Sequence, residues 1–277
     1  MSKNRLLASP EGKLTICLRN IKFSQYRGSC EGCDMATFKK KSFPLCILPC
    51  LFLFLTACTM AGKPSIGQDL QGGSARLPSR LLVLPVKVTI NELTAGGMVQ
   101  QDPDWSKQGE KAMAQAVREF FKTGLNASRA VGMPQLSEEE AELVRQHILL
   151  YHVVALEATI AKNLPGMGWS HLAGDFHYTL GPGLNFLKQR SGAEAALIVI
   201  GNDNISSGGR KTMVTMAALV GVAMPLGAST LVVGVIDLED GDILWFQQSV
   251  GTGNLDLRNP RDASTLFAKA MEGYGSR

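Results

Sequence analysis

The chain has 277 residues, and its 28 basic and 24 acidic side chains give a formal net charge of +4. Nine of the basic and three of the acidic residues precede Cys58, so the roughly 220 residues from there onward are slightly acidic and large enough for one domain. This balance excludes a basic nucleic-acid-binding surface, and we expect no nucleic-acid partner. All six cysteines lie at or before Cys58, which excludes disulfides and thiolate chemistry from the later chain.

Residues 35–57 have the organisation of a secretory signal peptide. Three lysines at 39–41 precede an apolar run that ends in Leu-Thr-Ala before Cys58. A basic segment, an apolar segment and a small-residue cleavage site are the parts of such a leader. Met35 gives it an ordinary length, so we expect residues 1–34 to be an over-extended start. The alternative for that segment is a disordered cytoplasmic extension.

The composition changes twice after the leader. Residues 58–80 are rich in Gly, Ser, Pro and Gln and contain few apolar side chains, which is typical of a flexible linker. We expect them to form a lipidated tether. The remaining residues, 81–277, are expected to form one folded periplasmic domain.

Four segments of the domain have strand patterns. Pro85 lies within the first and cannot donate to a strand ladder, which indicates a bulge or an edge position. The second is followed by a predicted polar loop, 201–211, and the last two are separated by a short turn, which predicts a hairpin. The predicted strands are 81–90, 195–200, 231–238 and 243–248.

Helix patterns alternate with these strands. From Trp105 to Phe121 the apolar residues recur at spacings of three and four, which places them on one helical face. Ser137 and Glu140 form a capping box for the next helix, and Asn259 can cap the last one. The predicted helices begin near Trp105, Ser137, Gly183 and Asn259. This alternation predicts an α/β or α+β domain with a single mixed β-sheet flanked by helices.

The run 212–236 contains no charged residue. It is long enough for a transmembrane helix, but Pro225 and several glycines interrupt it. We therefore expect two buried elements folded back on each other, 212–223 and 229–238, joined by a turn. Membrane insertion of the run is the alternative.

Two groups of polar residues are candidate sites. His171, Asp175 and His177 could bind a metal through imidazole and carboxylate, although polar surface is the more ordinary interpretation. The second group lacks the spacing of a phosphate-binding loop, because Arg210 separates Gly209 from Lys211. It could still hold an anion or a partner through backbone amides, with a solvated turn as the simpler interpretation. Its residues are Ser207, Gly208, Gly209, Arg210 and Lys211.

Several segments carry family resemblances. The ending Leu55-Thr56-Ala57-Cys58 resembles the lipobox of bacterial lipoproteins. The chain from Leu197 onward is similar to uncharacterised proteobacterial outer-membrane lipoproteins. The Asp-Leu-x-x-Gly-x-x-x-Trp pattern at 237–245 also resembles a hairpin in the Tol translocation protein amino-terminal domain and the curli secretion channel lipoprotein.

These resemblances imply a lipid at Cys58, and Thr59 after it implies export to the outer membrane. They bring no catalytic residues. We therefore expect a non-enzymatic lipoprotein on the periplasmic face of the outer membrane, without a cofactor, that binds an envelope protein or forms a homo-oligomer. The alternatives are a periplasmic metal-dependent enzyme and a membrane-inserting oligomer.

Overall fold

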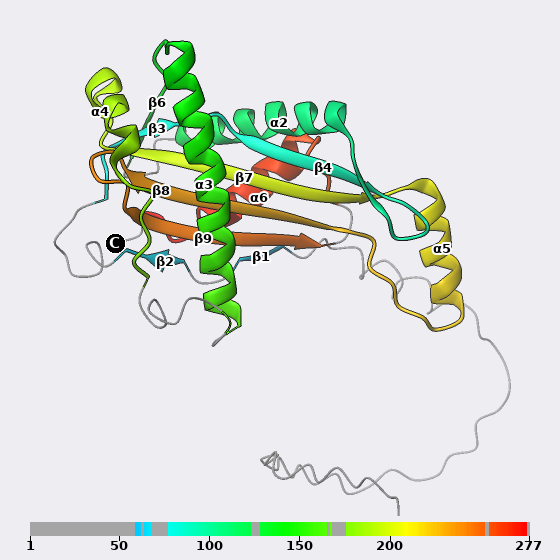
Figure 1. The fold of residues 1–277 in the computed structure, drawn as a ribbon. Helices are drawn as coiled ribbons and strands as arrows, with labels where there is room; N and C mark the ends of the chain where they lie inside the picture. Colours follow the sequence, from blue (N-terminus) through cyan, green and yellow to red (C-terminus); the bar gives the residue numbers. More distant parts are fainter. Residues whose placement is uncertain are drawn as a thin grey trace, which may run out of the picture. The chain divides into compact units, whose positions relative to one another are not determined.

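One mixed sheet forms the centre of the domain (Figure 1). The computed structural model describes residues 59–61, 64–67, 77–122, 128–164, 167, 176–252 and 255–275. The main strands, in spatial order, are β1 (Thr59–Ala61), β9 (Ile243–Thr252), β8 (Ala228–Asp237), β7 (Ala195–Ser206), β3 (Arg80–Val83) and β6 (Arg129–Val131). Three further strands join them: β2 (Ser65–Ile66) on β9, β4 (Lys87–Leu93) on β7, and β5 (Val99–Gln101) on β4. The predicted α/β class with a single mixed sheet is confirmed.

Helices cover both faces of this sheet. Helices α2 (Pro103–Lys122) and α6 (Pro260–Ala270) pack on one face. The other face is covered by α3 (Glu138–Asn163), by the 3-10 turn η3 (Pro182–Leu184) and by α4 (Asn185–Ser191). A further helix, α5 (Gly208–Leu219), extends beyond the end of β7 and stands apart from both layers (Figure 1).

The first half of β7 is continuously apolar because helices cover the strand on both faces. Ala195, Leu197 and Val199 belong to the core under α2 and α6, whereas Ala196 and Ile198 belong to the core under α3. Successive side chains of a strand point to opposite faces, so a strand covered on both faces needs apolar residues at every position.

The predicted helices are present with their caps. Ser137 accepts a hydrogen bond from the Glu140 backbone, and the Glu140 side chain accepts one from the Ser137 backbone, which closes the predicted capping box. Asn259 caps α6, and Pro260 occupies its first turn. The predicted strand 81–90 is divided into β3 and β4, because the chain leaves the ladder around Pro85.

The predicted polar loop 201–211 is wrong. Strand β7 continues to Ser206, and α5 begins at Gly208. The polar half of β7 stays in the ladder because it pairs with β4 on one side and β8 on the other. Its side chains also find partners, since the Asn91 amide donates to the side-chain oxygen of Asn204 at 3.0 Å.

Part of the predicted tether belongs to the sheet. Residues 59–61 pair antiparallel with β9, and residues 65–66 pair with the same strand further along. Backbone pairing needs no apolar side chains, which is why composition alone indicated a linker. Cys58 itself lies outside the described residues.

The uncharged run divides into a helix and a strand, as two elements were expected. The expectation that both are buried is wrong, because most of α5 is exposed whereas β8 is largely buried. In the part of the chain that the structure describes, no helix is both long and apolar enough to cross a membrane.

Candidate functional site

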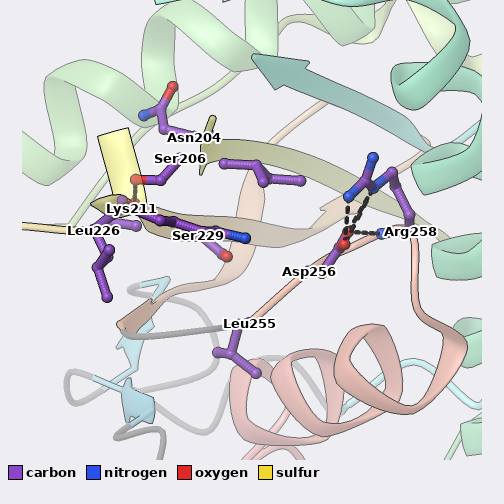
Figure 2. A pocket seen from close by; sticks show the side chains of 11 residues that line it. Asn204, Ser206, Lys211, Leu226, Ser229, Leu255, Asp256 and Arg258 are labelled. Carbon is purple, nitrogen blue, oxygen red and sulfur yellow. Dashed lines mark hydrogen bonds and ion pairs between the residues drawn. The ribbon is translucent and has the colours of Figure 1, made fainter. Parts of the chain in front are cut away.

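A polar pocket of about 280 Å³ lies where β7 ends and β8 begins (Figure 2). We call it the sheet-end pocket. Ligand pockets are commonly about 300–1,000 Å³, so this one suits a small polar group better than a whole cofactor. Three parts of the chain line it: the end of β7 (Asn204, Ile205, Ser206), α5 and the segment into β8 (Lys211, Leu226, Gly227, Ala228, Ser229), and the segment before α6 (Leu255, Asp256, Arg258).

Asp203 lies beside this pocket and ties two of its walls together. Its carboxylate accepts a hydrogen bond from the Ser229 hydroxyl at 2.8 Å and another from the Leu257 backbone N–H at 2.9 Å. The residue is 1% exposed, and burial raises the pKa of Asp203 to about 6, although both hydrogen bonds act in the opposite direction. Asp203 therefore joins β8 to the segment before α6.

Asp256 and Arg258 form an ion pair on one wall of the pocket (Figure 2). Arg258 Nη2 lies 2.7 Å from Asp256 Oδ2, and the guanidinium also lies 4.1 Å from the centre of the Trp105 ring. Burial alone would raise the pKa of Asp256, but hydrogen bonds and charge from Arg258 outweigh it, so the pKa is lowered. Asp256 is therefore an ionised partner of Arg258.

The five predicted anion-binding residues do not converge on one point. Ser207 is the N-cap of α5 and accepts from the Arg210 backbone, and Gly208 and Gly209 follow in the first turn. The Arg210 side chain instead donates to the Pro225 carbonyl at 3.0 Å. Of the five, Lys211 lines the sheet-end pocket. An anion or partner site there stays a prediction.

The predicted metal site is only partly visible. His171 and Asp175 lie outside the described residues. His177 lines a second, very small cavity of about 10 Å³ together with Phe176, Tyr178 and Asp242. Within the described ranges, no group of three or more His, Cys, Asp or Glu side chains could hold a metal ion.

Both serine hydroxyls in the described lining of the sheet-end pocket are engaged as hydrogen-bond donors. An activated hydroxyl needs a neighbouring base that a third group orients. Ser229 donates to the buried Asp203, and Ser206 donates to the Leu226 carbonyl. Among the residues that the structure describes, no histidine or cysteine lines this pocket. The charged side chains of the described lining are thus Lys211, Asp256 and Arg258, of which Asp256 and Arg258 are paired with each other.

Sequence patterns did not identify Asp203, Asp256 or Arg258. The polar residues at 202–204 directly follow a buried strand. They were the available signal that the strand continues to the end of the sheet with polar side chains. No sequence pattern identifies Asp256 and Arg258. They lie near β7 because the Leu257 backbone N–H between them donates to Asp203, which is distant in the chain.

No family model and no curated protein matches the chain. Among solved structures, the dodecamer of a PelC point variant from Paraburkholderia phytofirmans is 11% identical, with a TM-score of 0.32, over 80% of this chain and 100% of that chain. A PelC dodecamer from the same organism is 14% identical, with a TM-score of 0.31, over 79% of this chain and 99% of that chain. Similarity at this level carries no argument about activity or assembly.

Proposed function

We propose that this chain is a lipid-anchored lipoprotein of the cell envelope, on the periplasmic face of the outer membrane, with a non-enzymatic role in binding or assembling a partner protein. The observation that carries the proposal is the motif Leu55-Thr56-Ala57-Cys58 behind a basic and apolar leader. Thr59 after the cysteine favours the outer membrane by resemblance. We also propose kinship with the outer-membrane lipoproteins that the later chain resembles.

The anchor has a clear physical basis. Each acyl methylene buried in the bilayer contributes about 0.8 kcal/mol, and stable attachment takes two chains. A diacylglycerol on the Cys58 sulfur meets that requirement. Because Thr59 already pairs with Gly251 of β9, the fold would lie next to the membrane without a long spacer.

An apolar stripe on the outer side of α3 supports the partner-binding role. Leu149, Val153 and Leu156 are exposed and recur at spacings of four and three, so they lie along one side of the helix. The opposite side of α3 packs on the sheet. Contiguous exposed apolar patches are typical of surfaces that contact another protein or a membrane.

The anchor is tested with Cys58→Ser, and the matched control is Cys50→Ser within the leader. We expect Cys58→Ser to lose labelling by radioactive palmitate and to accumulate as uncut precursor. The control should be labelled and cut normally, because the leader is removed. Normal palmitate labelling of Cys58→Ser would reject the anchor, and recovery wholly in inner-membrane fractions would reject the outer-membrane assignment.

The partner-binding role is tested by photo-cross-linking in living cells. A photoreactive residue replaces Val153 in the stripe, and the control replaces Arg118, which is exposed on α2 at the other face of the sheet. We expect Val153 to yield a discrete protein adduct that Arg118 does not. The absence of any adduct at Val153 would contradict a partner on this stripe.

A further inference from the structure

The exposed large apolar side chains of the described residues fall into two groups. One group follows α3 and the residues just after it. The other lies at the α5 end of the sheet, on α5, the segment after it and the β4–β5 hairpin. Its members are Met98, Val99, Met216, Leu219, Val220 and Val222.

The register of the sheet connects this second group to the anchor position. Thr59 pairs with Gly251 of β9, Gly251 pairs with Ser229 of β8, and Ser229 pairs with Asp203 of β7. These four residues therefore form one row across the sheet. Strand β7 ends three residues after Asp203 and leads directly into α5. The amino terminus of β1 and the start of α5 thus lie at the same end of the sheet.

The distance between Cys58 and α5 is short enough for one membrane surface to reach both. Neighbouring strands lie about 4.8 Å apart, so Thr59 and Asp203, three strands away, are separated by roughly 14 Å. Cys58 precedes Thr59, and consecutive Cα atoms lie about 3.8 Å apart. A helix of 12 residues is about 18 Å long. A bilayer that holds a lipid on Cys58 is therefore within reach of α5.

The chemistry of α5 fits a lipid surface. No acidic residue occurs between positions 204 and 236, and Lys211 at the start of the helix is exposed. The hydroxyls of Thr212 and Thr215 donate to the carbonyls of Gly208 and Lys211, so these polar groups are satisfied within the helix. Polar groups that enter a bilayer need such internal partners.

The distribution of the apolar residues favours a bilayer over a second helix. A helix partner requires a stripe at spacings of three and four, as on α3. Met216, Leu219 and Val220 at the end of α5 also have these spacings, but the exposed group continues beyond the helix to Val222 and to Met98 of the β4–β5 hairpin. A group spread over a helix end, the segment after it and a hairpin is not a single helical stripe, and a fluid lipid phase can cover all of it at once.

We propose that the end of α5 and the segment after it, residues 216–222, contact the phospholipid surface beside the lipid anchor. This rests on the proposed attachment through Cys58 and adds a second membrane contact to it. Two contacts at one end of the sheet would fix the orientation of the domain, with the β8–β9 turn directed away from the bilayer.

The test uses the lipidated chain in vesicles of phosphatidylethanolamine and phosphatidylglycerol. Because no cysteine follows Cys58, a single introduced cysteine can be labelled selectively with an environment-sensitive fluorophore. The probe is placed by Leu219→Cys, and two controls place it by Val153→Cys on α3 and Asp240→Cys in the β8–β9 turn. Spin-labelled phospholipid in the vesicles then reports contact with lipid.

We expect quenching by the spin-labelled lipid to be several-fold stronger at position 219 than at 153 or 240, with a blue-shifted emission. Equal quenching at all three positions would overturn the inference. A probe at 219 that is shielded from both lipid and aqueous iodide would also overturn it, because another protein copy would then cover the helix. In either case the chain would still float with the vesicles, whereas loss of flotation of the lipidated chain would reject the anchor itself.

Discussion

The two halves of the uncharged run 212–236 differ in burial: the second half is buried and the first is exposed. In β8, Val233 and Val235 are completely buried, because β7 and β9 flank the strand and helices cover both faces. At the end of α5, Leu219 and the C-cap residue Val220 are 76% and 77% exposed. The same absence of charge therefore has two causes. In β8 it serves the core of the domain, and in residues 212–222 it leaves an exposed surface without charge.

A short segment separates these halves and holds α5 in place. Arg210 in the first turn of α5 donates to the Pro225 carbonyl, so the helix is tied to the chain that leads into β8. Gly227 follows with φ +134, close against the Asn204 carbonyl of β7. The boundary between the exposed and buried halves is thus defined by specific contacts at the sheet-end pocket.

The largest effect is expected from Val233→Asp in the buried half. An unpaired carboxylate at a completely buried position must lose its hydration or be protonated, and it also replaces packed methyl groups. We expect a loss of at least about 4 kcal/mol in the free energy of unfolding, enough to unfold many domains. Urea unfolding followed by circular dichroism measures it. Stability close to that of the unmodified chain would mean that β8 is not in the core.

The second effect is expected from Gly227→Ala, at the boundary between the exposed α5 and the buried β8. An added Cβ would lie 1.9 Å from the Asn204 carbonyl oxygen, and φ +134 is a conformation that other residues rarely adopt. Strain and crowding of this kind together cost about 2–4 kcal/mol. The matched control is Gly221→Ala, which also has positive φ but meets no atom of the described residues within 4 Å, and should cost about 1 kcal/mol. Equal losses for the two variants would show that the Asn204 contact is unimportant.

The third effect is a pH dependence of the free energy of unfolding, caused by Asp203 in the polar half of β7. Its pKa is about 6 in the folded chain and about 4 when unfolded, so the folded chain binds the proton more tightly. The free energy of unfolding therefore falls as the pH rises from about 4 to 6, by no more than about 2 kcal/mol. Asp203→Asn should remove this dependence, because an amide can still accept from Leu257 and donate to Ser229. A pH profile that is unchanged by the substitution would contradict the assignment.

Local sequence signals predicted the elements whose partners lie nearby or whose pattern is periodic. The capping box at Ser137 and the Asn259 cap depend on atoms within three residues, and both are present. The apolar half of β7 was also predicted, since a continuous apolar run of this length is typical of a strand covered on both faces. These signals were sufficient for the fold class.

The remaining features depend on distant segments, which explains why the sequence did not predict them. Strand β7 retains polar residues because Asn91 and the Leu257 amide, both distant in the chain, provide partners for Asn204 and Asp203. Residues 59–61 join the sheet through backbone pairing with β9, which leaves no compositional signal. The exposure of α5 was not predicted either, because the absence of charge in a run does not indicate whether its side chains are buried or exposed.

The smallest effect on stability is expected from Val220→Asp, the counterpart of Val233→Asp in the exposed half. Val220 is the C-cap residue of α5, and its side chain is already largely in water, so the change should alter the free energy of unfolding by no more than about 0.5 kcal/mol. On vesicles, however, a carboxylate at this position would have to enter the lipid surface or hold the helix away from it. We expect the Leu219→Cys probe to lose most of its quenching by spin-labelled lipid when Val220→Asp is added, while urea unfolding stays unchanged. A large loss of stability would instead place α5 in the core with β8, and unchanged quenching would show that residue 220 does not face the bilayer.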